Sequence, residues 1–256
     1  MLTYDQLLAL IVVAVMGHIM ALFWHLADRY NARLFRKRIY DIPLPAGQLR
    51  QEIINSVFTP VHSIMLGMFL VFGFFQNTTW TSFILSLLMT AVWAEIWHYF
   101  SHRAFHLNKL HWIHAKHHKS KLNSPFTAIS FSLTEKLIFN LGIMGFMALM
   151  DTVISVNFFG VAGWYVGYLL INSYSHANFE IKSSNFLHLA GKLLTSTTYH
   201  ALHHSRYNSN YGLGTRLLDQ LFGTEAQDYE DLYMQITTDR LPLKKLSEKC
   251  SPQTRI

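Results

Sequence analysis

The stretch WTSFILSLLMTAVWAEIWHYFSHRAFHLNKLHWIHAKHHKS, Trp80–Ser120, joins an apolar run to a dense group of histidines. Its first part, Trp80–Ala94, contains no charged residue, and the apolar character extends past Glu95 to Phe100. The part from Trp97 onward holds seven histidines in 24 residues. Imidazole titrates near neutral pH and is neither a good core filler nor a dependable surface charge. The stretch therefore predicts an apolar helix that ends in a group of imidazoles with a shared task.

The rest of the chain is equally apolar. Charged residues make up only 14% of the 256 residues, against about 25% in soluble domains. A spanning helix needs about 20 largely apolar residues, so the first, second and fifth apolar runs are long enough to cross a membrane outright. The third and fourth are shorter, and the last two could form a tight hairpin that does not cross fully. The runs are Leu7–Leu26, Ile54–Phe75, Trp80–Ala94, Leu137–Met150 and Val153–Ser173.

The distribution of basic residues predicts the orientation. Lys and Arg cluster between the first two runs and after the third and fifth, whereas Gln76–Thr79 has no charge. By the positive-inside rule this places the amino terminus outside and the basic loops and carboxyl terminus in the cytoplasm. No basic region precedes the first run, so we expect a retained span rather than a cleaved signal. The net charge of +6 is then explained by topology and anionic headgroups rather than by nucleic acid.

Three histidine clusters have spacings that suit metal binding. His102 and His106 are four residues apart, and the pattern H-x2-H-H occurs twice. Residues three and four apart share a face of a helix, so each cluster presents its rings to one point. Neutral imidazole suits iron, zinc, copper and nickel, and eight ligands are too many for one ion. The clusters predict two metal ions in one site, with His176 as a ninth ligand. The two H-x2-H-H clusters are His114, His117, His118 and His200, His203, His204.

Further residues are candidates for supporting roles. Asn172 lies one turn before His176 and could offer a carbonyl oxygen or bind a metal-bound water. His98 shares a face with His102 but lies behind it. Ligating histidines usually donate their other ring N–H to an acceptor such as a carboxylate, and Glu95, Glu135 and Asp219 are the carboxylates near the clusters.

The remaining histidines have simpler interpretations. His18, His25 and His62 lie within apolar runs, and we expect each to be buried or interfacial and bonded to a backbone carbonyl. His111 is expected to be either a hydrogen-bonding neighbour of the ligands or a surface residue, and His188 a surface residue. The single cysteine, Cys250, allows no disulfide within the chain.

The motifs HRAFH…HWIHAKHH…HANF…YHALHHSRYNSNYG…LLDQLFGTE resemble the sterol desaturase and fatty acid hydroxylase superfamily of integral membrane di-iron oxidases. The resemblance runs from about Trp93 to Glu225. The stretch NSPFTAISFSLTEKL is similar to a segment of C-5 sterol desaturases, with Glu135 at the glutamate, although it lacks the His-Pro of those members. His111 stands where members usually have an aromatic residue. Neither departure touches a proposed ligand.

The resemblance implies an all-α, multi-pass transmembrane helical bundle with a cytoplasmic helical cap that holds the dimetal site. It divides the chain into transmembrane helices with a basic interfacial loop (1–92), a catalytic domain (93–225) and a cytoplasmic tail (226–256). It implies two iron ions that use O2 and two electrons to hydroxylate or desaturate a lipid from the bilayer. The electrons come from cytochrome b5 or a ferredoxin/reductase chain. The implied ligands are His102, His106, His114, His117, His118, His176, His200, His203 and His204.

Two other classes of function remain open from the sequence. A metal transporter usually binds its ions near the midplane of the bilayer on broken helices, whereas these clusters lie outside the apolar runs among basic residues. A non-catalytic family member that binds lipid or metal is the second alternative, although all three clusters are intact. Hydroxylation and desaturation share the first hydrogen abstraction, so the sequence does not separate them. The membrane is the endoplasmic reticulum in a eukaryote or the inner membrane in a bacterium.

Overall fold

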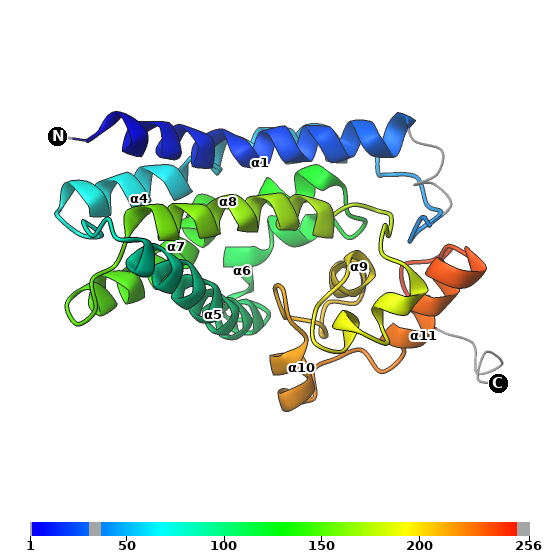
Figure 1. Ribbon diagram of the computed structural model, residues 1–256. Coiled ribbons are helices and arrows are strands. Elements are labelled where there is room, and N and C mark those ends of the chain that lie inside the picture. The colour runs from blue at the N-terminus through cyan, green and yellow to red at the C-terminus, as the bar shows by residue number, and fades with distance from the viewer. Residues whose placement is uncertain (1, 31–36, 250–256) are drawn as a thin grey trace.

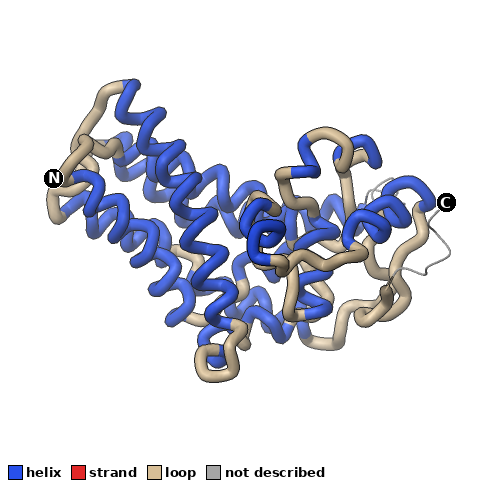
Figure 2. Tube along the Cα trace, turned by 90° about the horizontal axis from the view of Figure 1, so that it is seen from below, coloured by secondary structure: helices blue, strands red, loops and turns tan. Residues whose placement is uncertain are grey.

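The chain is helical throughout the part that the structure describes. The computed structural model describes residues 2–30 and 37–249, and Cys250 lies outside them. Within these residues no β-strand forms, and backbone pairing between segments is limited to isolated bridges such as that of Arg38 with Phe179. Figure 2 shows helices connected by loops and turns. The predicted all-α class is confirmed.

The apolar runs form the long helices of a bundle (Figure 1). Four segments are long and apolar enough to span a membrane, namely Tyr4–Tyr30, Gln48–Val71, Trp80–Phe105 and Leu133–Asp151. The predicted multi-pass bundle is therefore confirmed. The helices are α1 (Tyr4–Tyr30), α3 (Gln48–Asn55), the 3-10 turn η1 (Ser56–Phe58), α4 (Val61–Val71), α5 (Trp80–Phe105), α7 (Leu133–Asp151) and α8 (Phe158–Ser175).

The third run extends past Glu95 as expected, whereas the fifth run differs from the expectation. α5 has 26 residues, because the helix continues through Glu95, and at 1.5 Å per residue it is about 39 Å long. It therefore extends beyond the hydrocarbon layer of about 30 Å. The run Val153–Ser173 was expected to span outright, but its helix α8 begins only at Phe158 and is not among the four candidate spans. Its asparagines, serines and tyrosines lower its hydropathy.

α8 lies inside the bundle and packs against α1 and α5 (Figure 1). Gly160 permits the close approach to α5, because a Cβ atom there would lie 2.5 Å from the carbonyl oxygen of Phe83. The outward face of α1 is different, since Ile11, Val15 and Ile19 are exposed. Exposed apolar side chains on a long helix are suited to contact with lipid. The bundle thus combines a tightly packed interior with an apolar outer surface.

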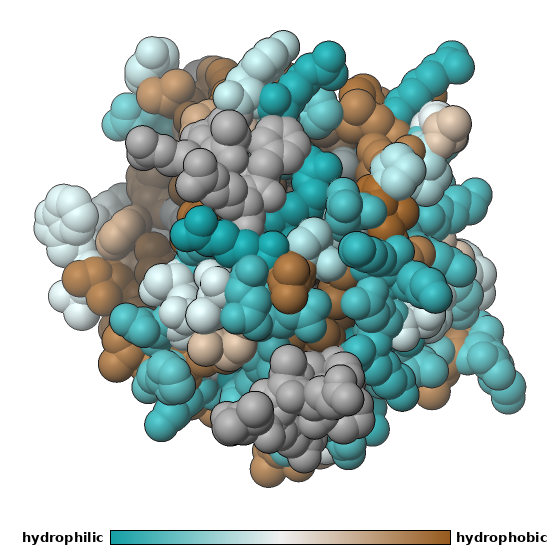
Figure 3. Space-filling view, turned by 90° about the vertical axis from the view of Figure 1, so that its right-hand side faces the viewer, coloured by the Kyte–Doolittle hydropathy of each residue, from teal (hydrophilic) through white to brown (hydrophobic). Residues whose placement is uncertain are grey.

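Short helices and turns form the other end of the molecule (Figure 1). Their buried side chains include Tyr40, Tyr199, Leu202, Tyr229 and Tyr233, which form a core separate from that of the bundle. The end face over these helices is largely hydrophilic (Figure 3). The proposed domain boundaries at 92 and 225 stay a prediction. These elements are α6 (His111–His114), η2 (His117–Lys119), η3 (Pro125–Ile129), η4 (Ser184–Phe186), η5 (Ala190–Lys192), α9 (Thr197–Arg206), α10 (Leu217–Phe222), α11 (Tyr229–Met234) and the π-helical turn η6 (Gln235–Asp239).

Candidate metal centre

The histidine clusters lie where the long helices meet the short ones. α5 ends at Phe105 and carries His102 in its last turn, with His106 as its C-cap. His176 is the C-cap of α8. α9 carries the last cluster, and its N-cap is Ser196, whose side chain accepts a hydrogen bond from the N–H of Tyr199. Helix ends on three separate elements therefore converge on one region.

The middle cluster departs from the helix that its spacing predicts. α6 ends at His114, and the chain turns before the 3-10 helix that carries His117 and His118. The H-x2-H-H pattern is thus divided between two short turns. His114 and His118 face one group of histidines and His117 faces another. The unbroken helix α9 divides its cluster in the same way, with His200 and His204 in one group and His203 in the other.

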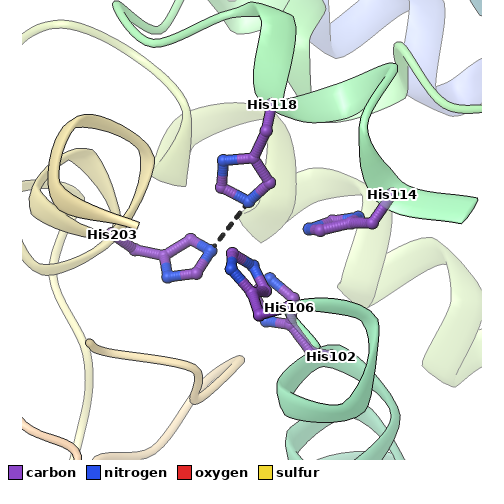
Figure 4. A group of neighbouring side chains, drawn as sticks. All are labelled: His102, His106, His114, His118 and His203. Atoms are coloured by element: carbon purple, nitrogen blue, oxygen red, sulfur yellow. Dashed lines mark hydrogen bonds between the residues drawn. The ribbon is translucent and has the colours of Figure 1, made fainter. Parts of the chain in front are cut away.

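Five histidines form the first group, in which the candidate ligand atoms all lie within 4.8 Å of one another. Figure 4 shows their rings directed towards a common centre from α5, from the middle cluster and from α9. The Nε2 atoms of His118 and His203 are 3.0 Å apart. The group, called here the five-histidine group, consists of His102, His106, His114, His118 and His203.

Four histidines form the second group under the same limit of 4.8 Å. The Nε2 atom of His176 is 2.8 Å from that of His200 and 3.4 Å from that of His117. The two groups are neighbours, because the ring centroids of His118 and His204 are 4.7 Å apart. This second group, called the four-histidine group, consists of His117, His176, His200 and His204.

Hydrogen bonds to oxygen acceptors determine which nitrogen faces inward. The Nδ1 atom of His176 bonds to the carbonyl oxygen of Asn172 at 2.8 Å, and that of His204 to the carbonyl of Ser120 at 2.9 Å. The Nδ1 atom of His117 is 3.2 Å from the carbonyl of Ser130. A carbonyl can only accept, so each Nδ1 carries the proton and each Nε2 is an unprotonated imine nitrogen. The rings are oriented as those of metal-ligating histidines usually are.

The five-histidine group is oriented in the same way. The Nδ1 atoms of His102 and His203 bond to the carbonyl oxygens of Tyr211 and Ser209 at 3.0 and 2.7 Å. His114 donates from Nδ1 to the carboxylate of Glu135. The inward Nε2 atoms of His102 and His114, and both ring nitrogens of His106, are buried without a hydrogen-bond partner in the described part of the chain. Buried polar atoms without partners are rare in proteins.

The surroundings keep these rings neutral. Burial, followed by the neighbouring imidazoles His102 and His111, lowers the pKa of His106 to about 2. Burial lowers the pKa of His176 to about 4, although its bond to Asn172 opposes the shift. Burial and then adjacent histidines hold the pKa values of His117, His200 and His204 well below the usual value.

The four-histidine group fits a cation better than it fits hydrogen bonding. Three of its inward nitrogens carry no proton and cannot donate a hydrogen bond. At these short distances their lone pairs repel one another. Two nitrogens that each lie about 2.1 Å from a shared ion, at right angles, are about 3.0 Å apart. The observed separations of 2.8, 3.2 and 3.4 Å bracket that value. The two groups could therefore each hold a metal ion.

The supporting residues divide into those that contact the ligands and those that do not. Glu135 contacts His114 directly. Asn172 contacts His176 through its backbone carbonyl, while its side-chain Nδ2 donates to Ala128. Asp219 does not contact a histidine. It accepts hydrogen bonds from the backbone N–H groups of Tyr211 and Gly212, and so positions the carbonyl of Tyr211 that accepts from His102.

Two candidates lie elsewhere in the site. His98 is behind His102, with ring centroids 4.8 Å apart. Glu95 reaches no ligand, because its carboxylate accepts from the backbone N–H groups of Gly214 and Thr215 at 2.8 and 3.1 Å. The expectation that Glu95 is a partner of a ligating histidine is wrong, since the loop at 214–215 occupies its oxygens.

The histidines of the apolar runs are held differently from the expectation. His18 bonds to the hydroxyl of Ser56 at 3.1 Å, and His62 bonds to the side chains of Asn140 and Lys136. The predicted bond to a backbone carbonyl is wrong for His62, because carbonyls inside helices already accept from their own helix. His25 packs edge-on against Phe126. His188 is exposed as predicted.

Several contributors were missed by the sequence analysis. Tyr207 packs against His106 and His118, with ring centroids 4.6 and 4.7 Å away, and its hydroxyl bonds to His111. Glu52, only 1% exposed, accepts from the hydroxyl of Ser120, the residue whose carbonyl holds His204. Glu52 lies in the polar segment QLRQEIIN, before the apolar run that begins at Ile54, so the sequence gives no signal for its role.

Two neighbouring cavities lie beside the histidines. The smaller, about 40 Å³, is lined by members of both groups together with Lys136, Phe139 and Phe131. The larger, about 720 Å³, lies between α5 and α8 and is mostly apolar. Both are lined by Tyr168, Asn172, Ser175 and Leu213, so the groove adjoins the cavity beside the histidine groups. Its volume is within the range of sites that take small organic ligands.

Comparison with known proteins identifies the family. The sequence model described as Fatty acid hydroxylase matches residues 87–224, more than half of the chain. The chain belongs to the fatty acid hydroxylase family. The predicted superfamily is confirmed, and both histidine groups lie within the matched region. Together with its four apolar helices, the family identifies a membrane protein.

Named relatives of this fatty acid hydroxylase family member are plant proteins. The very-long-chain aldehyde decarbonylase CER1 of Arabidopsis thaliana is 25% identical over 82% of the chain, and this covers 35% of CER1. The very-long-chain aldehyde decarbonylase GL1-6 of Oryza sativa subsp. indica is 28% identical over 54% of the chain and 22% of its own length. The chain thus spans about a third or less of these two relatives. No solved structure was found to match the chain.

Proposed function

We propose that this chain is a membrane-bound di-iron oxidase that uses O2 and two electrons to hydroxylate or desaturate a C–H position of a lipid. The nine histidines of the two groups are its proposed ligands. The four-histidine group carries the proposal, because three buried imine nitrogens on His117, His176 and His204 face one another without a proton to share. A bound cation relieves their repulsion. Iron is the choice that the family supports among the metals suited to imidazole.

When bound, the iron pair supplies the dioxygen and one-electron chemistry that protein side chains lack. The chain's own residues orient and protect the site. Backbone carbonyls hold the ligand rings from behind, and Glu135 places a carboxylate behind His114. Phe131 stacks on His117 with 4.3 Å between ring centroids and limits the access of water to that ring. The groove between α5 and α8 brings the lipid to the centre.

The site is proposed to lie on the cytoplasmic side, because the basic loops are on the side that carries the histidine clusters. The hydrophilic end face over the short helices is then available to a soluble electron donor, either cytochrome b5 or a ferredoxin with its reductase (Figure 3). The membrane is the endoplasmic reticulum in a eukaryote or the inner membrane in a bacterium.

A second reaction is favoured by the relatives named very-long-chain aldehyde decarbonylases. In that case the substrate is a long-chain aldehyde, and the product lacks its carbonyl carbon. A transport role has less support, because each of six ligand rings is held from behind by an oxygen acceptor. Such bonds suit a fixed site rather than a transit site.

Lipid mass spectrometry of cells with and without the gene tests the proposal. A product with one added oxygen indicates hydroxylation, loss of two hydrogens indicates desaturation, and loss of the carbonyl carbon indicates the second reaction. His203→Ala is expected to abolish the product, while His188→Ala, at an exposed position, is the control that retains it. Normal product from His203→Ala would refute the assignment.

A further inference from the structure

Lys136 is the one buried lysine that lines the cavity beside the histidines, and nothing in the proposed metal centre uses it. Its exposure is 2%. In the described part of the chain no carboxylate oxygen lies within 4.0 Å of its amine. Glu135 interacts with the amine electrostatically, but its carboxylate bonds to His114. A buried cation is costly unless it is paired. The position of the amine therefore calls for a partner.

A chain of hydrogen bonds holds the amine in place. The side-chain Nδ2 of Asn140 donates to the backbone carbonyl of Lys136, which fixes its Oδ1 as an acceptor. That Oδ1 accepts from Tyr165 at 2.8 Å and from Nδ1 of His62 at 2.9 Å. His62 then has an unprotonated Nε2, which accepts from the amine of Lys136 at 2.9 Å.

The remaining hydrogens of the amine are directed elsewhere. A lysine amine carries three donors when it is charged, and His62 takes one. The amine also lies 4.3 Å from the ring centroid of Phe131. Because Lys136 lines the small cavity, a donor is available there, beside the ligand His176. The cavity of about 40 Å³ has space for a small polar group rather than for an alkyl chain.

The groove has space for the alkyl chain of a lipid. Its walls include Leu87 and Val92 of α5 and Gly167 of α8, and a Cβ atom at Gly167 would meet nothing within 4 Å. A linear alkyl chain suits such a mostly apolar groove, and it would run from the lipid-facing side of the bundle to the small cavity. Lys136 lines the small cavity, which shares four lining residues with the groove.

We propose that Lys136 binds the carboxylate of a single-chain lipid whose alkyl chain lies in the groove between α5 and α8. The carbons next to the carboxylate then lie beside the four-histidine group, and the far end of the chain lies in the groove. This inference deepens the proposed function and rests on it for the statement that those carbons are the ones oxidised. The binding itself does not require the metals.

Lys182 provides a matched control. It lines the groove, is half-buried, and donates to the carbonyl of Thr195 at 2.8 Å. It also lies over a phenylalanine ring, that of Phe186, at 4.1 Å. If the carboxylate were held on the wall of the groove instead of in the small cavity, it would meet Lys182 instead of Lys136.

Competition binding with the full-length protein in detergent tests the proposal. Radiolabelled hexadecanoic acid is displaced by unlabelled hexadecanoic acid or hexadecanol. The acid is expected to compete about tenfold better than the alcohol, as one hydrogen bond to a charged group implies. Lys136→Met is expected to remove that preference, and Lys182→Met to keep it. Equal competition in the wild-type protein, or loss of the preference only in Lys182→Met, would overturn the proposal.

Photocrosslinking of the wild-type protein decides the matter if Lys136→Met does not fold. A fatty acid with a diazirine next to the carboxylate is expected to label Phe131 or Phe139, and one with a terminal diazirine to label Leu87 or Val92. The reverse pattern, or the same pattern for both probes, contradicts the proposed direction. Both measurements are repeated after removal of metal. The carboxylate preference is expected to persist in the metal-free protein. A protein that shows the preference but contains no iron as purified refutes the di-iron function alone, and one that contains iron but lacks the preference refutes the Lys136 site alone.

Discussion

Replacing Glu135 with glutamine removes one negative charge from behind His114 and keeps the size of the side chain. Both residues are buried, and His114 donates to the carboxylate from Nδ1. Glutamine can still accept that hydrogen bond through its Oε1, so the ring keeps its orientation but loses a charged partner. Loss of such a partner typically weakens metal binding by about 10- to 100-fold, or about 1.4 to 2.7 kcal/mol. We expect this loss for the ion of the five-histidine group.

Titration of the metal-free protein with Fe²⁺ under anaerobic conditions, in competition with a chelator, measures this affinity. The expected result is one weakened site and one unchanged site. Glu95→Gln is the matched control, because its carboxylate binds the backbone of Gly214 and Thr215 and no histidine. Equal affinities in Glu135→Gln and the wild-type protein would remove Glu135 from the metal centre. Equal losses in Glu135→Gln and Glu95→Gln would indicate a general structural effect.

Two further predictions concern stability. The buried histidines have pKa values below that of the unfolded chain, as with His176 at about 4, so only the unfolded chain gains protons just below pH 6.5. The metal-free protein is therefore expected to lose stability as the pH falls from 6.5 towards 4, by up to about 1.4 kcal/mol per pH unit for each such histidine. Thermal unfolding at a series of pH values measures this, and melting temperatures that do not change over this range would contradict it. Gly160→Ala is expected to cost about 1 to 3 kcal/mol, because the new methyl meets Phe83. The control Gly145→Ala, with nothing within 4 Å of the added Cβ, is expected to unfold like the wild-type protein; equal stability of both variants would contradict the close packing of α8 on α5.

The helical class and the convergence of the histidines follow from local patterns. Apolar runs predict the long helices, and spacings of three and four residues place His200, His203 and His204 on one side of α9, as observed. The structure brings all nine predicted histidines into two groups. That they bind metal stays a prediction.

The break within the middle cluster depends on tertiary structure. The middle cluster has the same spacing as the last one, but α6 ends at His114 and the chain turns before His117. No helical periodicity reveals that turn. The acceptors behind the rings are also hidden, because most of them are backbone carbonyls, such as those of Tyr211 and Ser209, and every residue type has a backbone carbonyl.

The contacts of buried charged residues do not follow from the sequence. Glu95 and Glu135 both lie in apolar segments near the histidines, yet only Glu135 reaches a ligand. The difference arises from the loop at 214–215, which is far from Glu95 in sequence. Similarly, Lys136 and His62 are 74 residues apart, and their contact requires the packing of α4 against α7.

Iron content per chain tests the central claim most directly. The protein is purified from iron-replete cells without oxygen, and its iron is determined by elemental analysis together with that of His203→Ala and His204→Ala, each of which removes a ring from one group only. Two histidine-bound ions predict about two iron atoms per chain in the wild-type protein and a lower content in each variant. A wild-type protein that contains no iron, or that contains the same amount as both variants, would contradict a di-iron centre built from these histidines.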